Sequence, residues 1–252
     1  MKQAVPLSYQ VNEIILGSLL GDGSLKVHKG YKNARFSFRH SDKQSEYFYW
    51  KAKMLKEISG NGDVFVQKPD GFSANNKLRY QSRALQMLTE LYKLTHKRKT
   101  FTIRRKWLNL MTPLSLAIWW FDDGSLITNS RKGVFCTDGF SKESVEILAR
   151  YLNKVWGIKA HVAPINRQRF DRKNQYWRLW IRSTDELKKF LRIILPHTPQ
   201  SMLSKVILLY KDSQLQQRWI SEVANFSGID QHAVKKAVDQ KKSGWKAFQR
   251  MI

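Results

Sequence analysis

The stretches ILGSLLGDG at residues 15–23 and LAIWWFDDG at residues 116–124 end in the same way. Each is an apolar run of helical character that stops at an acid, Asp22 or Asp123, followed by glycine, serine and leucine. An acid at the C-terminal end of a helix lies at the negative pole of the helix dipole, which disfavours it. Because the arrangement occurs twice in a basic chain, we predict that both acids are placed there for a cation.

The pattern around the two acids repeats, and this repeat predicts the architecture. Each half reads helix, strand, helix, strand, strand, helix. After Asp22 we expect strands at 33–39, 63–68 and 78–82, with helices at 45–58 and 84–94. After Asp123 we expect strands at 133–137, 159–165 and 176–182, with helices at 142–156 and 185–195. We therefore predict an α+β monomer with pseudo-twofold symmetry, whose first repeat is 1–110 and whose second is 111–212.

Helix-end signals agree with this division. Ser8 is a capping residue for the first acid-bearing helix, and Thr112 followed by Pro113 starts the second. Gly23 and Gly124 are expected to supply the left-handed residue that ends each helix.

Gly17 and Gly21 lie four residues apart, on one face of the first acid-bearing helix. Small residues at that spacing let a second backbone come close. We expect the second helix to approach them at Ala117 or at the backbone near Asp122.

A further segment, 213–252, lies outside the repeat. Two short helices are expected at 219–226 and 231–238, joined by 227–230. A helix-turn-helix of this kind can contact DNA through its lysines, which are Lys235, Lys236, Lys241 and Lys242. A plain helical appendage packed on the second half is the simpler interpretation, and the role of the segment stays open.

Composition indicates a folded protein with a polyanionic partner. The chain of 252 residues is 42% hydrophobic, carries a formal charge of +25 and has a pI near 10.2. Nucleic acid is the commonest partner of such a chain. The single cysteine, Cys136, excludes an internal disulfide, and the six histidines show no spacing typical of a metal site. No membrane partner and no secretory signal are expected, so we predict an intracellular protein of the bacterial cytoplasm, plastid or mitochondrion.

Several predicted strands have one apolar face and one basic or polar face. In 176–182, for example, Trp177, Leu179 and Ile181 alternate with polar and aromatic side chains. Such a face suits a DNA groove, because arginine reads guanine and glutamine reads adenine while other basic groups bind phosphates. The candidate DNA-binding residues are Arg35, Ser37, Arg39, Arg79, Gln81, Arg83, Arg167, Arg169, Arg172, Lys173, Tyr176, Arg178, Trp180 and Arg182. With roughly ten phosphate contacts, DNA affinity falls by several orders of magnitude between low and moderate salt.

At the two acid-bearing stretches the chain resembles the LAGLIDADG homing endonucleases. The resemblance covers roughly residues 8–212, and the second motif looks like that of the single-chain, intron-encoded members. It implies two αββαββα units forming a saddle, with the motif helices paired at its centre and two antiparallel sheets along the DNA. It also implies one more strand in each half, at 24–27 and 126–130.

The resemblance further implies the chemistry. Asp22 and Asp123 would each bind Mg²⁺, with Mn²⁺ as a substitute and Ca²⁺ supporting binding without cleavage, and each acid would serve one DNA strand. The backbone carbonyls of Gly21 and Asp122 would join the metal sites, whereas the Asp122 side chain is expected to cap the helix or face solvent. A lysine often lies near each metal in this family; Lys205 matches that segment in the second half, and Lys99 is chosen in the first.

Three functions stay open at this point. The first is a site-specific homing endonuclease that cuts both strands of double-stranded DNA across the minor groove. The second is an RNA-binding maturase that acts on its own intron. The third is a non-cleaving DNA-binding protein on the same scaffold, against which the retention of both acids argues.

Overall fold

The computed structural model describes residues 6–68, 76–127, 131–169 and 172–249. Packing divides the chain into two compact units, 1–122 and 123–252. Helix α5 (Pro113–Asp123) therefore packs almost entirely in the first unit, although its sequence begins the second repeat. The repeat boundaries at 110 and 212 stay a prediction about the sequence.

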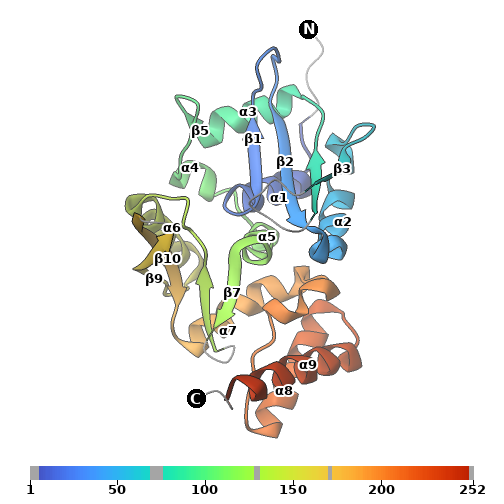
Figure 1. The fold of residues 1–252 in the computed structure, drawn as a ribbon, viewed down its shortest axis with the longest axis vertical. Helices are drawn as coiled ribbons and strands as arrows, with labels where there is room; N and C mark the ends of the chain where they lie inside the picture. The colour runs from blue at the N-terminus through green and yellow to red at the C-terminus, as the bar shows by residue number, and fades with distance from the viewer. Residues whose placement is uncertain (1–5, 69–75, 128–130, 170–171, 250–252) are drawn as a thin grey trace. The chain divides into compact units, whose positions relative to one another are not determined.

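The first unit contains a four-stranded antiparallel sheet of order β1-β2-β4-β3 (Figure 1). Its main elements are α1 (Tyr9–Leu19), β1 (Gly23–Lys26), β2 (Arg35–Ser41), α2 (Ser45–Met54), β3 (Val64–Gln67), β4 (Lys77–Gln81) and α3 (Gln86–Thr95). Shorter elements are η1 (Asp42–Gln44), η2 (Lys56–Ile58), β5 (His96–Lys97), β6 (Thr100–Phe101) and α4 (Arg105–Leu108).

The second unit repeats this sheet in the order β7-β8-β10-β9. Its elements are β7 (Gly124–Ile127), β8 (Lys132–Phe135), α6 (Lys142–Trp156), β9 (His161–Arg169), β10 (Arg172–Ile181), α7 (Thr184–Ile194), η3 (Leu195–His197), η4 (Gln200–Lys205), α8 (Ser213–Ser227) and α9 (Gln231–Gln249). With α5 placed first, both repeats read αββαββα, so the predicted duplicated α+β fold is confirmed. Strands β1 and β7 are the two that the resemblance added, and residues 128–130 of the predicted 126–130 strand lie outside the described residues.

Register in the first sheet explains how one face becomes core. Phe38 pairs with Gly23 on one side and Tyr80 on the other, and both aromatic side chains are buried. The residues next to these in each strand face the other side of the sheet, where Ser37 pairs with Ser24 and with Gln81. The predicted alternation in β2 and β4 is therefore confirmed.

The two acid-bearing helices make their closest approach at the predicted glycines. A Cβ atom at Gly17 would lie 2.3 Å from the Ser115 carbonyl oxygen and 2.9 Å from the Ile118 Cβ. A Cβ atom at Gly21 would lie 2.5 Å from the Asp122 Cβ. Contact near Asp122 is confirmed, but Ser115 and not Ala117 faces Gly17, and its hydroxyl donates to the Glu13 carbonyl at 2.9 Å.

The predicted capping residues of the two acid-bearing helices are confirmed. The prediction that Gly23 ends the first of them in a left-handed conformation is wrong. Ser8 accepts from the Val11 N–H, and the Thr112 hydroxyl accepts from the Ser115 N–H. Gly23 does not have a left-handed backbone. It begins β1, and a Cβ there would lie 2.6 Å from the Ser18 Cβ, so glycine is needed for close packing. Gly124 likewise begins β7.

Gly17→Ala is expected to lower the free energy of unfolding by about 1–2 kcal/mol. Overpacking costs about 1–3 kcal/mol, and the better helix propensity of alanine returns up to about 1 kcal/mol. Gly139→Ala is the control, because a Cβ atom there meets nothing within 4 Å. Denaturant unfolding of both variants checks this, and equal stability of the two would contradict the close approach.

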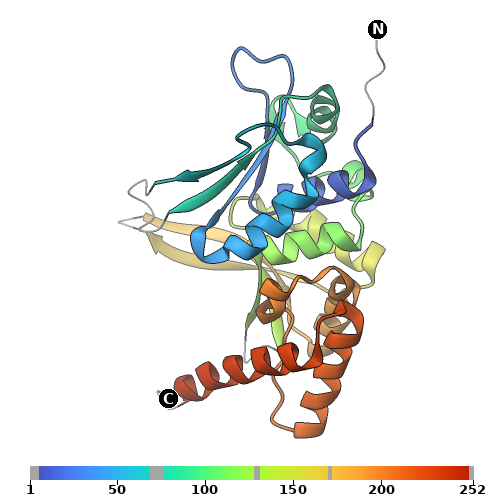
Figure 2. The ribbon, with the colours of Figure 1, turned by 90° about the vertical axis from the view of Figure 1, so that its right-hand side faces the viewer.

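The C-terminal segment forms a helical pair packed on the second unit. Helices α8 and α9 contact each other, and Figure 2 shows α9 running to the C-terminus. Buried side chains of the pair include Trp219, Val223, Val234 and Val238. The two helices expected here are present and longer than expected, and a DNA contact of this segment stays a prediction. In the described part of the chain, no helix is long and apolar enough to cross a membrane.

Candidate active site

Asp22 follows α1 in a short turn. The N–H of Leu20 donates to the Gly17 carbonyl and the N–H of Gly21 to the Ser18 carbonyl, which closes the helix, and β1 begins directly after Asp22. Its side chain is 39% exposed. Asp123, by contrast, is the last residue of α5. The two acids therefore occupy equivalent helix-to-strand junctions, but Asp22 lies just beyond its helix.

A buried histidine links Asp22 to the neighbouring acid. His40 Nδ1 lies 3.3 Å from Asp22 Oδ2, and His40 Nε2 lies 3.8 Å from Asp122 Oδ1. Ligand atoms of all three residues lie within 4.8 Å of one another. His40 Nε2 is buried and makes no hydrogen bond to the residues that the structure describes. The spacing of the histidines along the chain gave no sign of this cluster, which the fold brings together.

The Asp122 side chain is fully buried in an ion pair, so the expectation of a capping or solvent role is wrong. Lys51 Nζ donates to its two oxygens at 2.7 and 3.0 Å. The Tyr47 hydroxyl donates to Oδ1 at 2.8 Å, and the Asp22 N–H donates to Oδ2 at 3.3 Å. A buried charge needs such partners because transfer from water is costly. Asp122 thus fixes the Asp22 backbone.

The tyrosine of this network stays protonated. Burial, followed by the charge and hydrogen bond of Asp122, raises the pKa of Tyr47 well above its ordinary value. The Tyr47 hydroxyl is therefore a stable donor to Asp122. Lys51 and Tyr47 both come from α2, one helical turn apart, so this helix supplies two side-chain donors to Asp122.

This donor set fits a divalent cation at Asp22. Asp122 is neutralised by Lys51, and Asp22 is a partly exposed carboxylate beside an imidazole nitrogen. Hard divalent cations prefer carboxylate and carbonyl oxygens. Asp22 is consequently the residue that would hold such an ion in this unit.

The second acid has different neighbours. The N–H of Cys136 donates to the Asp123 carbonyl at 2.9 Å, which joins the end of α5 to β8. Arg178 binds Asp138 through two hydrogen bonds of 2.7 and 2.8 Å. Those bonds are the main cause that raises the pKa of Arg178, and the charge of Asp123 adds to the same effect. Arg178 therefore carries its charge near Asp123 with its guanidinium already paired.

The imidazole of the first unit has no counterpart in the second. Gly23 pairs with Phe38 and Gly124 pairs with Phe135, so His40 corresponds to Thr137, two residues further on. The Thr137 hydroxyl donates to the Trp177 carbonyl at 2.7 Å. The two junctions are thus alike in backbone and unlike in side-chain chemistry.

The two proposed lysines are placed differently. Lys99 lies exposed at the tip of the β5–β6 hairpin with a left-handed backbone (φ 66°), whereas Lys51 contacts Asp122. Lys205 is the last residue of η4, which contacts β7, the strand that follows Asp123. The catalytic role of either lysine stays a prediction.

Most of the proposed DNA-binding residues of the first unit share the polar sheet face. Arg39 pairs with Arg79, and Ser37 with Gln81, while Arg35 lies over the Tyr31 ring at 4.2 Å. Arg83 differs, because it lies beyond β4 and its guanidinium donates to the Glu57 carbonyl.

In the second unit, Tyr176, Arg178 and Trp180 alternate with buried Leu179 along β10. Arg182 lies one residue beyond that strand and is exposed. Four candidates belong to the β9–β10 hairpin, but their side chains lie outside the described part of the structure: Arg167, Arg169, Arg172 and Lys173.

Sequence reasoning missed His40, Tyr47 and Lys51, although a signal was present. His40 continues the buried alternation of Phe36 and Phe38 in β2. Lys51 occupies an apolar position of α2, one turn after Tyr47. A lysine at a core position implies an acidic partner, because lysine is almost never buried unpaired.

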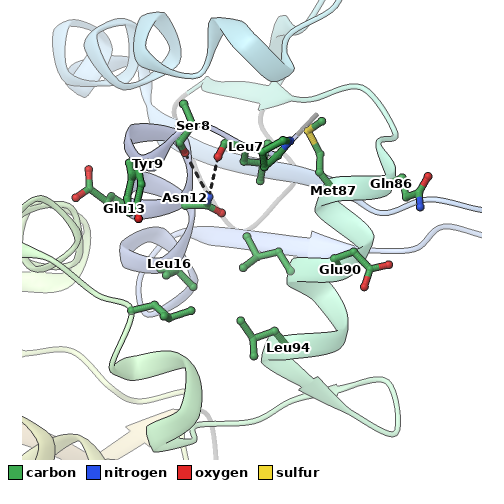
Figure 3. Close-up of a pocket in the computed structure, with 13 residues that line it drawn as sticks. Leu7, Ser8, Tyr9, Asn12, Glu13, Leu16, Gln86, Met87, Glu90 and Leu94 are labelled. Carbon is green, nitrogen blue, oxygen red and sulfur yellow. Dashed lines mark hydrogen bonds between the residues drawn. The ribbon is translucent and has the colours of Figure 1, made fainter. Parts of the chain in front are cut away.

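A separate apolar cavity of about 850 Å³ lies in the first unit (Figure 3). Its lining comes mainly from α1 and α3, including Leu16, Met87 and Leu94. The carboxylates among its lining residues are Glu13 and Glu90, and neither belongs to the Asp22 cluster. The cavity therefore lacks the chemistry of the acid site.

Comparisons with known proteins identify the same architecture. A model of the LAGLIDADG DNA endonuclease family matches residues 12–190. Protein RecA of Mycobacterium gastri is 33% identical over 172 residues, 60% of this chain and 38% of that protein. The cytochrome b mRNA maturase bI2 of Saccharomyces cerevisiae is 26% identical over 212 residues, 80% of this chain and 48% of that protein. The chain thus spans less than half the length of either relative.

A solved structure, the homing endonuclease I-WcaI bound to its DNA recognition sequence, matches with a TM-score of 0.67. The match covers 83% of this chain and 91% of that one, at 22% sequence identity. At that identity the likeness concerns the fold.

Proposed function

Because the chain belongs to the LAGLIDADG DNA endonuclease family, we propose that it is a site-specific homing endonuclease that cuts both strands of a long DNA target. The observation that carries the proposal is the pair of acids, Asp22 and Asp123, at equivalent helix-to-strand junctions of a duplicated fold. A protein that only binds DNA has no need of carboxylates beside phosphates, since they repel each other. We propose that one chain, as a monomer, supplies both sites.

The polar sheet faces are the proposed DNA-binding surfaces. Arg35, Arg39, Arg79 and Gln81 present donors and positive charge on one side of the first sheet, with the core on the other. Phosphate contacts position such a protein and base-edge contacts give specificity. The DNA-bound structure of I-WcaI supports the same partner here.

We propose Mg²⁺ as the physiological ion, held by Asp22 in the first unit and Asp123 in the second, with backbone carbonyls of Gly21 and Asp122 as further ligands. A bound divalent cation polarises the scissile phosphate and lowers the pKa of the attacking water. Lys205 would stabilise the negative charge that develops at phosphorus. In the first unit Lys51 acts indirectly, by holding Asp122 against the Asp22 backbone.

An RNA-binding maturase is the second candidate. The yeast maturase bI2 matches 80% of this chain, which is the observation that favours it. The partner would then be the intron RNA of the gene that encodes the chain, bound through basic surfaces. DNA cleavage and RNA binding can be measured independently, so assays of both distinguish the two candidate functions.

Plasmid cleavage tests the proposed function. The substrate is a supercoiled plasmid that carries the uninterrupted form of the DNA site into which the coding element is inserted. We expect a linear product with Mg²⁺ or Mn²⁺, and a gel shift without product with Ca²⁺. A protein that shifts this DNA but yields no linear or nicked product with Mg²⁺ is not the proposed enzyme. Selective binding to the spliceable intron RNA would then support the maturase.

DNA affinity in Ca²⁺ is expected to depend steeply on salt. With roughly ten phosphate contacts, the logarithm of the association constant falls with log salt at a slope of about −9, or several orders of magnitude between 50 and 200 mM. Fluorescence anisotropy with target DNA measures this slope. A slope near −2 would contradict the proposed basic sheet surfaces.

A further inference from the structure

The segment after η4 depends on side chains of the C-terminal helical pair. Val206, Ile207, Leu208 and Leu209 are buried but belong to no helix or strand. Buried backbone groups outside regular structure need partners from elsewhere, because an unmade hydrogen bond there costs free energy. The source of those partners decides what holds the segment in place.

Two side chains of α8, Gln216 and Trp219, supply part of these hydrogen bonds, and Lys241 of α9 adds to them. Trp219 Nε1 donates to the Val206 carbonyl at 3.2 Å. The Gln216 amide donates to the Leu208 carbonyl at 3.1 Å and accepts from the Tyr210 N–H at 2.9 Å. Gln216 and Trp219 are themselves buried, so these bonds are shielded from water.

Lys241 makes the contact nearest to Lys205. Its Nζ donates to the Ser204 carbonyl at 2.5 Å and to the Ile207 carbonyl at 3.2 Å. These carbonyls belong to residues on either side of Lys205. Burial lowers the pKa of Lys241 to about 8, which agrees with an amine enclosed between α9 and η4. Lys241 is therefore a structural bridge, unlike the exposed Lys235 and Lys236 on the same helix.

The segment that carries Lys205 contacts the strand that follows Asp123. Helix η4, which ends at Lys205, contacts β7, and β7 begins directly after Asp123. The position of the Lys205 backbone relative to this strand is thus set partly by the bonds from α9.

We propose that the C-terminal helical pair positions Lys205 for the reaction at Asp123, and that Lys241 is the positioning residue of this contact. The proposal rests on the proposed endonuclease function only in the role given to Lys205. It assigns a purpose to residues 213–252, which lie beyond the matched family region of 12–190. If Lys241 instead contacted a DNA phosphate directly, its loss would lower DNA affinity and leave hydrogen exchange of the free protein unchanged.

Lys241→Met tests the proposal, with Lys236→Met as the matched control. Methionine keeps the length of the side chain but cannot donate to the two carbonyls. Without DNA, amide hydrogen exchange at residues 201–210 should become about tenfold faster in Lys241→Met, since two hydrogen bonds to this segment are lost. It should be unchanged in Lys236→Met. Unchanged exchange in Lys241→Met overturns the proposal, whatever the activity of the protein.

Strand-resolved cleavage separates positioning from a general structural loss. Asp123→Asn first identifies the DNA strand that depends on this half of the protein. In Lys241→Met, that strand should be nicked about ten- to a hundredfold more slowly at saturating protein, with the other strand and the DNA affinity unchanged. Lys241→Arg, which keeps a donor, should recover part of the rate. Equal slowing of both strands, or a loss of DNA affinity alone, overturns the assignment.

The proposed function and the positioning role of Lys241 can be disproved independently. If the wild-type protein cuts no DNA, the proposed function fails, while hydrogen exchange still decides whether Lys241 holds the Lys205 segment. If the wild type cuts and the variant loses neither exchange protection nor strand-specific rate, the inference alone fails.

Discussion

Asp22→Asn is expected to abolish the linear DNA product and leave a nicked circle. Asparagine has the same shape but no charge, so it binds a divalent cation far more weakly. Loss of that ion should slow cleavage of one strand by at least about 10²- to 10³-fold, while Asp123 still serves the other. DNA affinity in Ca²⁺ should change by less than about threefold, because the sheet surfaces are untouched.

The effect should be specific to this acid. Asp42→Asn removes an exposed carboxylate of η1 and is the charge-matched control. Asp123→Asn should give the complementary nick, in the opposite strand, and the double variant should give no product. Gel analysis of plasmid forms and of end-labelled DNA measures all four. Linear DNA formed by Asp22→Asn at the wild-type rate would falsify the role given to Asp22.

The two nicks need not form at equal rates. Asp22 has His40 beside it, whereas the position equivalent to His40 holds Thr137, whose hydroxyl is bonded to a backbone carbonyl. We therefore expect the metal affinity and the orientation of the carboxylate to differ between the halves. Strand-resolved time courses of the wild type are expected to show one strand cut first.

Lys51→Met is expected to have the largest effect on stability, a loss of about 3–5 kcal/mol. Both side chains of the Lys51–Asp122 pair are fully buried, so removing the lysine leaves a carboxylate in the core without its counter-charge. Tyr47 alone cannot offset that cost. Since Asp122 also accepts from the Asp22 N–H, the variant should impair cleavage of the Asp22-dependent strand as well.

A double variant distinguishes the buried charge from lost packing. Lys51→Met with Asp122→Asn removes both charges and keeps one oxygen acceptor, which can serve Tyr47 or the Asp22 N–H, so it should recover part of the lost stability. Lys53→Met, two residues along and exposed, is the control and should change stability by less than about 0.5 kcal/mol. Denaturant unfolding of the full chain gives these values. A Lys51→Met protein as stable as Lys53→Met would show that the pair is not buried.

Much of the fold could be predicted because its signals are local. The alternation of Phe36 and Phe38 with Arg35 and Ser37 predicts β2, and α6 was expected at its observed bounds of 142–156. The short strands β1 and β7 were not evident from alternation, since four residues directly after a helix carry little pattern. Only the resemblance predicted them.

The candidate site was predicted only in part. Asp22 and Asp123 were found from their junctions, but Asp122 was given the wrong environment, because its partners lie 71 and 75 positions away along the chain. Lys99 was chosen by its place in the repeat, and Lys51, which contacts Asp122 from the buried face of α2, was not foreseen.

The sequence by itself determined the duplicated αββαββα order, the glycine-mediated helix contact, the two acids and the basic strand faces. Each follows from periodicity, residue size or charge within a short window. Only the tertiary structure decided that Asp122 is neutralised by Lys51, that His40 lies beside Asp22, and that Lys241 holds the segment of Lys205. These are contacts between side chains distant in sequence, and the free energy of burying a charge depends on which groups the fold brings to it.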